Sequence, residues 1–248
     1  MIEWLRGEVA DPHVAVAGRR LPIAIRRHPR ARRLTMRLSP EGSELRITLP
    51  TWGRTMDALA FAKARTAWIE AQLARVPTPQ DVGPGARIPF RDESLTVEWQ
   101  PDARRVPRLE GSALVLGGPA ERIAPRIRQW LEQEALRLTG EDLAFYCARA
   151  ACPTPGLGLS RAQRRWGSCS GPTSGLRARA PSIRINWRLV MAPDYVRRSV
   201  VAHEVAHLAH FDHSPAFHAH LAQLFEGDLR AADGWLRREG RGLYAQFG

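Results

Sequence analysis

The sequence has 248 residues, of which 44% are hydrophobic and 25% are charged, so it can bury a sizeable core and is not a mainly disordered chain. Residues 1–10 lack the apolar core of a signal peptide, and no apolar run approaches the roughly 20 residues needed to span a bilayer, so we expect a cytoplasmic protein with no membrane segment. The formal net charge is +12, and nearly all of the positive charge comes from arginine, since Lys63 is the only lysine. Such a charge can indicate binding to nucleic acid or to an acidic partner.

The first half of the chain has the patterns of β-strands. Five runs have strand character: Leu21–Arg26, Arg33–Leu38, Glu44–Leu49, Ser94–Trp99 and Ala113–Leu116. The second and third runs alternate polar with apolar residues, and Glu41-Gly42-Ser43 between them predicts a hairpin turn. From Met56 to Leu73 the apolar residues fit one amphipathic helix, and we expect Trp52 and Trp68 to contribute to its core.

From about Pro119 the pattern becomes helical. Apolar residues keep helical spacing from Ile123 to Leu138, and Gly140 can break or bend the helix there. Further on, the sequence predicts an extended segment and then three helices: Ile183–Leu189, Asp194–His210, Pro215–Phe225 and Leu229–Arg238. A β-rich region at residues 1–118 followed by a helical domain at residues 119–248 is typical of an α+β fold.

The helix predicted at Asp194–His210 contains the motif H-E-x-x-H, formed by His203, Glu204 and His207. Residues four apart on a helix share one face, about 6 Å apart along the axis, so the two imidazoles can bind one zinc ion at about 2.0–2.1 Å each. Glu204 lies about 100° around the helix from His203, where it can act as general base for a water held by the metal. Asp194 is expected to cap the first turn of the helix.

A third ligand is predicted at His213, six residues after His207, which is the spacing of H-E-x-x-H-x-x-G-x-x-H zinc proteases. Ser214-Pro215 is a helix-start signal, so the chain turns before it and His213 can reach back over the preceding helix. His210 is the alternative, but a ligand from a turn completes a tetrahedron better than a third one from the same helix. Because His210 replaces the glycine of that motif, we expect Asp212 to make the turn in a left-handed conformation.

Several blocks, in sequence and in order, resemble the YgjP-like metallopeptidases: Arg165-Trp166-Gly167-Ser168-Cys169-Ser170, Ile185-Asn186-Trp187-Arg188-Leu189, His203-Glu204-Val205-Ala206-His207-Leu208 and His213-Ser214-Pro215-Ala216-Phe217. The resemblance extends more weakly to Arg30-Ala31-Arg32-Arg33-Leu34 and to Trp68. It implies a zincin-like minigluzincin fold with a catalytic Zn²⁺ held by His203, His207 and His213, and with Glu204 as base. The sequence departs from the family pattern at two places that affect the expected shape of the substrate cleft. The connection Gly171–Ser182 is longer than expected, and Asp212 replaces a usual asparagine.

The Trp-Gly-Ser-Cys block has two interpretations. It can form a cleft wall, with Ile183–Leu189 as an edge strand that pairs with an extended peptide, or it can be a tight turn packed by Trp166 and Trp187. A nucleophilic role for Cys169 is not favoured, because no base is assigned to it. The oxyanion-stabilising group is not identified; His210, Tyr195 and Arg188 are the candidates.

The sequence thus predicts a zinc metallopeptidase, an endopeptidase acting on protein or peptide substrates. One alternative is a protease associated with nucleic acid, similar to the SprT-like proteases that act on protein crosslinked to DNA, in which the arginines of Arg26–Arg37 hold phosphates. Arginine is spread along the whole chain and not gathered in one patch, which favours arginines that are merely exposed to solvent over arginines that bind nucleic acid. The other alternative is a non-catalytic zinc-binding module. The three cysteines form no C-x-x-C pair, which predicts free thiols in a reducing compartment.

Overall fold

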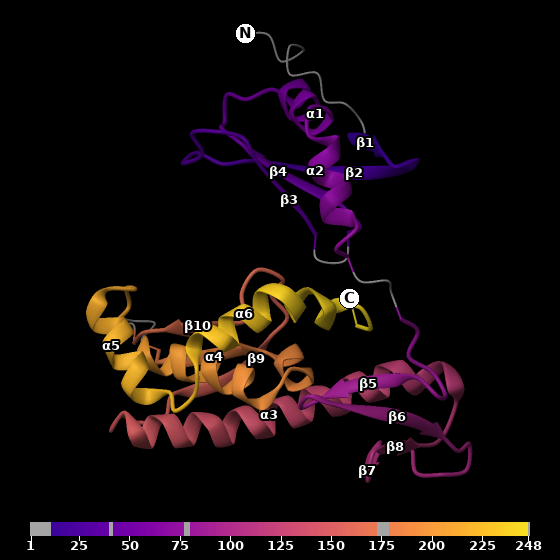
Figure 1. The fold of residues 1–248 in the computed structure, drawn as a ribbon, viewed down its shortest axis with the longest axis vertical. Helices are drawn as coiled ribbons and strands as arrows, with labels where there is room; N and C mark the ends of the chain where they lie inside the picture. Colours follow the sequence, from indigo (N-terminus) through magenta and orange to yellow (C-terminus); the bar gives the residue numbers. More distant parts are fainter. Residues whose placement is uncertain (1–10, 40–41, 77–79, 173–178, 248) are drawn as a thin grey trace. The chain divides into compact units, whose positions relative to one another are not determined.

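The computed structural model describes residues 11–39, 42–76, 80–172 and 179–247 and has a mixed α+β fold. It divides into two compact units, within residues 1–79 and 80–247 (Figure 1). This division differs from the expected boundary at residue 118, because the sheet of residues 87–116 shares its core with the helices that follow it. Glu41 of the predicted hairpin turn and residues 173–178 of the long connection lie outside the described residues.

The first unit contains a four-stranded sheet and two helices. Its elements are β1 (His13–Val16), β2 (Arg19–Arg27), β3 (Thr35–Leu38), β4 (Leu45–Leu49), α1 (Thr55–Lys63) and α2 (Thr66–Leu73). The strand order is β1-β2-β4-β3, with β2 and β4 parallel and the other two pairs antiparallel. The three strands predicted here and the antiparallel pairing of the hairpin are therefore confirmed.

Two expectations for this unit are wrong. The predicted single helix is two helices, because the backbone leaves the helical conformation at Arg65, and this break lets Ala62 of α1 and Ile69 of α2 both reach the core. The two tryptophans do not join that core: Trp52 is 76% exposed and Trp68 is 40% exposed. The core consists of smaller aliphatic side chains from the sheet and the buried faces of both helices.

The second unit contains two sheets and several helices. Its elements are β5 (Arg87–Phe90), β6 (Glu93–Trp99), β7 (Arg108–Glu110), β8 (Ala113–Leu116), η2 (Ala120–Arg122), α3 (Ile123–Arg149), β9 (Gly156–Ser160), β10 (Gly167–Ser170), β11 (Ser182–Asn186), η3 (Trp187–Met191), α4 (Asp194–Ala206), α5 (Pro215–Leu224), α6 (Leu229–Glu239) and η4 (Gly240–Tyr244). The strands predicted at Ser94–Trp99 and Ala113–Leu116 are confirmed as β6 and β8. Within the described residues, no helix combines the length and the apolar character needed to cross a membrane.

The three-stranded sheet has the order β10-β11-β9. The predicted extended segment is the middle strand β11, followed by the short helix η3, so the expectation that it forms an edge is wrong. β11 pairs antiparallel with β10 and parallel with β9. The Trp-Gly-Ser-Cys block therefore contributes the edge strand, β10.

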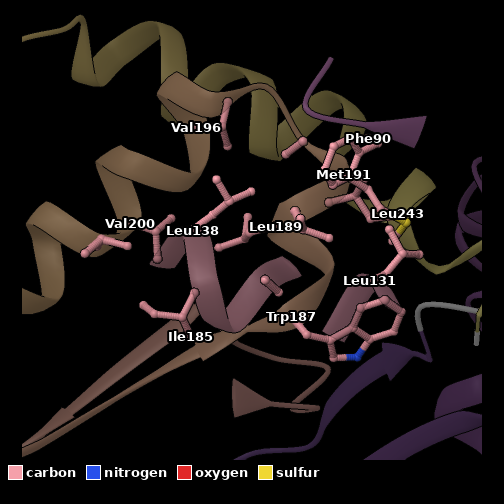
Figure 2. Close-up of a cluster of buried hydrophobic side chains, with 14 of the residues drawn as sticks. Phe90, Leu131, Leu138, Ile185, Trp187, Leu189, Met191, Val196, Val200 and Leu243 are labelled. Carbon is pink, nitrogen blue, oxygen red and sulfur yellow. The ribbon is translucent and has the colours of Figure 1, made fainter. Parts of the chain in front are cut away.

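The core of the second unit positions α4. The helix α3 is continuous through Gly140, which contradicts the expected break there. Figure 2 shows side chains from several elements meeting in one buried cluster: Leu131 and Leu138 from α3, Ile185 from β11, Trp187, Leu189 and Met191 from η3, and Val196 and Val200 from α4. Because α4 packs on α3 and also contacts α5, α6 and β10, its histidine-bearing end has a fixed place beside the sheet.

Candidate metal centre

Helix α4 carries the histidine motif at its C-terminal end. Val196 and Val200 of its inward stripe are buried, and His203 and His207 continue this stripe at intermediate exposure. The helix ends earlier than predicted, because His207 is its C-cap. The expectation that Asp194 caps the first turn is wrong. Its carboxylate instead pairs with Arg91 and Arg197.

Three imidazoles converge beyond the end of α4. His203 Nε2 lies 3.1 Å from His207 Nε2 and 3.3 Å from His213 Nε2, and the candidate ligand atoms of all three lie within 4.8 Å of one another. Nitrogens bound to one tetrahedral zinc ion at about 2.0–2.1 Å stand roughly 3.3–3.4 Å apart, so the observed spacing fits a common metal. This is the only such cluster within the described part of the chain.

The contacts around the rings fix their orientation. His207 Nδ1 lies 2.9 Å from the carbonyl oxygen of His210. A carbonyl only accepts, so His207 carries its proton on Nδ1 and has a free lone pair on Nε2, the arrangement of a metal-binding histidine. The buried Phe217 ring lies beneath all three imidazoles, with centroid distances of 4.5–5.0 Å.

The turn that contains His213 ends at the helix start predicted at Ser214-Pro215, but its backbone conformation at Asp212 differs from the prediction. Ser214 is the N-cap of α5, its side chain accepts a hydrogen bond from the Phe217 backbone N–H, and Pro215 stands at the start of the helix. Asp212 does not adopt the expected left-handed conformation. It shapes the turn with its side chain, because Oδ1 accepts the Ser214 backbone N–H at 3.3 Å, which is an Asx-turn.

Electrostatics favour a neutral imidazole at His203. Burial, with the neighbouring histidines, lowers the pKa of His203 to about 4, so its ring is uncharged at neutral pH. Neutral imidazole is the form that binds metals. With three imidazole nitrogens at suitable spacing, the residues present fit a zinc ion.

Glu204 lies beside the cluster, buried against β10. A β-carbon at Gly167 would stand 2.3 Å from Glu204 Oε1, so the carboxylate packs directly on the backbone of this strand. The Cys169 backbone N–H donates a hydrogen bond to it. Burial raises the pKa of Glu204 to about 7, although the positive charge of Arg165 acts in the opposite direction.

A cleft of about 510 Å³ opens beside His203 and Glu204. Apolar side chains make much of its lining: Trp166, Val200, Leu221, Leu229 and Leu236. Gly167 lines it as well, whereas Trp187 is fully buried in the core, so the Trp-Gly-Ser-Cys block forms a cleft wall. Burial, together with the nearby Glu204 charge, raises the pKa of the Cys169 thiol to about 11, which keeps the thiol protonated at neutral pH.

The other residues considered from the sequence have different surroundings. The His210 ring packs against His220, and Tyr195 is exposed at the far end of α4. Arg188 is buried, with its guanidinium over the ring of Tyr244. His218 is exposed and also lines the cleft.

Sequence reasoning assigned no role to two residues of the site, although both lie in the blocks that resemble the family. Arg165 lines the cleft, and its positive charge acts on Glu204. Phe217 has the apolar spacing of an ordinary core residue in α5, and only the fold places it beneath the imidazoles.

The chain matches a family model described as YgjP-like, metallopeptidase domain, over residues 32–239. The match begins in the first compact unit and extends through α6 of the second. No curated protein and no solved structure matches the chain.

Proposed function

Because the chain belongs to the YgjP-like metallopeptidase family, we propose that it is a zinc-dependent endopeptidase in which His203, His207 and His213 hold Zn²⁺ and Glu204 is the general base. The observation that carries this proposal is the meeting of three imidazoles beside one buried carboxylate. The proposal includes a zincin-like minigluzincin arrangement, with α4 lying against the sheet edge β10.

The roles of the protein groups follow from their surroundings. A bound zinc ion supplies Lewis acidity, which polarises the scissile carbonyl and lowers the pKa of a water molecule towards about 7. The Glu204 carboxylate takes a proton from the attacking water and delivers it to the leaving amine. Its hydrogen bond from the Cys169 N–H and its packing on Gly167 hold it in one position, so little reorganisation is needed during proton transfer.

The edge strand β10 is suited to bind an extended peptide. The Cys169 N–H donates to Glu204 and not to β11. By contrast, the Asn186 N–H at the end of β11 donates a hydrogen bond to the Trp166 carbonyl oxygen, next to β10. In an antiparallel pair, residues alternate between facing the partner strand and facing outward, so the backbone of Gly167 also faces the free edge. We propose that substrate adds to this edge as a strand, and that Arg165 in the cleft wall stabilises the developing oxyanion.

The Glu204→Gln variant tests the proposed base. It should keep stoichiometric zinc but lose cleavage of an unfolded protein substrate by about 100-fold or more, the range for removal of a general base. Glu141→Gln is the matched control, because the Glu141 side chain is 62% exposed and, among the described residues, forms an ion pair only with the surface residue Arg137. Wild-type activity in Glu204→Gln would rule out Glu204 as the base.

A non-catalytic zinc module remains the rival for the same residues. It predicts that the wild-type protein binds zinc but cleaves none of a set of unfolded proteins, whereas the peptidase proposal predicts cleavage that stops on chelation. The buried carboxylate favours the peptidase, because a metal used only to join helices needs no acid–base group beside it.

A further inference from the structure

The first compact unit carries most of the net charge of the protein. Residues 1–79 contain 14 arginine and lysine residues and seven aspartate and glutamate residues, a net charge of +7 on less than a third of the chain. The whole chain has a net charge of +12. The net positive charge is therefore denser in the unit that does not contain the metal centre, although arginine itself is spread along the whole chain.

A groove of about 630 Å³ in this unit combines arginines with aromatic rings. We call it the Trp52–Trp68 groove, and its lining residues with these two features are Arg32, Arg33, Arg65, Trp52, Phe61 and Trp68. None of the described residues that line it is acidic. The groove therefore presents positive charge and flat apolar surface together.

The turn that carries Trp52 is held by defined contacts. Trp52 is 76% exposed on a turn where a β-carbon at Gly53 would meet Leu49 Cδ1 at 2.6 Å. Arg27 ties the same turn to α1, because its guanidinium donates to the Gly53 carbonyl oxygen and to Thr55 Oγ1, at 3.4 and 3.1 Å. A large ring that is exposed to solvent on a well-supported turn is typical of a binding site.

The arginines of the groove are available to a ligand. The Arg65 guanidinium lies over the Phe61 ring, 3.9 Å from its centroid, and presents its outer face to solvent. Arg32 and Arg33 are exposed and belong to none of the ion pairs among the described residues. No ion pair within the described residues therefore neutralises their charges.

We propose that the Trp52–Trp68 groove binds single-stranded nucleic acid, with bases stacked on Trp52 and Trp68 and phosphates held by the arginines. Exposed aromatic rings beside a positive groove are the two elements of single-strand recognition, since every base has a π-face and every nucleotide a phosphate. An acidic peptide would satisfy the arginines but leave the rings without a matching partner. A duplex keeps its bases inside the stack, where Trp52 cannot reach them.

Fluorescence anisotropy of the full-length protein with labelled oligonucleotides tests the proposal. The probes are oligo-dT and oligo-rU of about 15 nucleotides, which separate DNA from RNA, and a duplex of the same length. Binding at low salt should be tighter for at least one single strand than for the duplex, and should weaken as salt rises. No binding of either single strand at 50 mM salt, or equal binding of the duplex, would overturn the proposal.

Variants separate stacking from charge. Trp52→Leu keeps an apolar side chain but removes the flat ring, so it should weaken binding by about 5-fold or more, whereas Trp52→Tyr should retain most of it. Arg33→Ala should lower the dependence of log K on log salt by about 0.7, the value for one phosphate contact on a single strand. Arg19 is the first residue of β2, where this strand pairs with β1, and it does not line the groove. Arg19→Ala therefore removes one positive charge outside the groove and should keep the affinity within about twofold.

Two results would overturn the inference even if an oligonucleotide binds. One is unchanged affinity in Trp52→Leu, which would mean that no base stacks on the ring. The other is competition by poly-glutamate equal to that of an unlabelled oligonucleotide, which would make the groove a site for acidic protein. Neither result bears on the peptidase, because the binding assay requires neither zinc nor Glu204.

Discussion

The Glu204 carboxylate and the Gly167 backbone occupy adjoining space, so that a single methyl group at residue 167 would come within 2.3 Å of Glu204 Oε1. The two residues are 37 positions apart in the sequence, on α4 and on the edge strand β10. The missing side chain of Gly167 lets the carboxylate lie against the strand and receive the Cys169 N–H. Glycine at this position is thus a condition for the placement of the proposed base.

Replacing Gly167 with alanine should therefore displace Glu204 and lower kcat by about 10- to 100-fold, because catalysis is sensitive to shifts of about 1 Å. Zinc content should stay stoichiometric, since the three atoms nearest to the added β-carbon all belong to Glu204 and none to a histidine. Gly158→Ala is the control in the same sheet, where the nearest atom to an added β-carbon is Arg184 Nε at an ordinary 3.6 Å. Full activity in Gly167→Ala would show that the carboxylate position is not critical.

The metal site predicts different outcomes for two nearby histidines. His213→Ala removes a proposed ligand and should lower zinc affinity by more than about 100-fold, the upper range for loss of an outer-shell partner. His210→Ala should keep the metal, because His210 contributes its backbone carbonyl to His207 and not its ring. Metal analysis after dialysis measures this directly.

Thermal melts give a second readout for the same pair. A metal at 100 times its Kd adds about 2.7 kcal/mol to stability, so chelation should lower the Tm of the wild type and of His210→Ala. Chelation should leave the Tm of His213→Ala nearly unchanged. If His213→Ala retains zinc and His210→Ala loses it, the ligand assignment is reversed.

Local sequence is enough to bring the three histidines of the candidate site together. His203 and His207 meet because a helix repeats its face every four residues, and His213 returns because Ser214-Pro215 starts a new helix. These relationships span about ten residues and depend on backbone geometry alone. The proximity of the three histidines can therefore be predicted from the sequence before any tertiary contact is known.

Relationships that depend on tertiary packing were not predicted. Apolar composition suggested that Trp52 is in the core, but smaller aliphatic side chains already fill that core. The sequence could not tell that Ile183–Leu189 forms the middle of its sheet, since strand order follows from pairings with β9 and β10. The same limit applies to the boundary at residue 118, because a sheet can share its core with helices that come later in the chain.

The apolar cleft beside Glu204 predicts the kind of side chain that the enzyme accepts. Leu236→Arg places a charge among apolar lining residues and should reduce cleavage next to large apolar residues by about 10-fold or more, while zinc is retained. Leu136→Arg is the control, because Leu136 is 46% exposed on α3 and does not line the cleft. Mass spectrometry of a digested peptide library measures the preference. If Leu236→Arg cleaves the same sites at the same rates, the cleft does not bind substrate.

Arg197 holds α4 to α3 through a buried ion pair with Asp142. The Nε–Oδ2 distance is 2.8 Å, and the two side chains are 3% and 8% exposed. Arg197→Met should destabilise the protein by about 3–5 kcal/mol, because it leaves a buried carboxylate without its partner. Arg137→Met, which breaks the exposed pairs with Glu134 and Glu141, should change stability by less than about 1 kcal/mol.

The loss in Arg197→Met should depend on pH. Burial raises the pKa of Asp142, against the opposing effect of Arg197, so the folded state binds this proton more tightly than the unfolded state. Its contribution to stability is therefore complete below an unfolded pKa of about 3.9 and falls as pH rises through the raised value. Without Arg197 the pKa rises further, and urea denaturation should show a larger deficit at pH 7.5 than at pH 4.5. An equal deficit at both pH values would assign the loss to packing, and recovery in Arg197→Met/Asp142→Leu would assign it to the uncompensated charge.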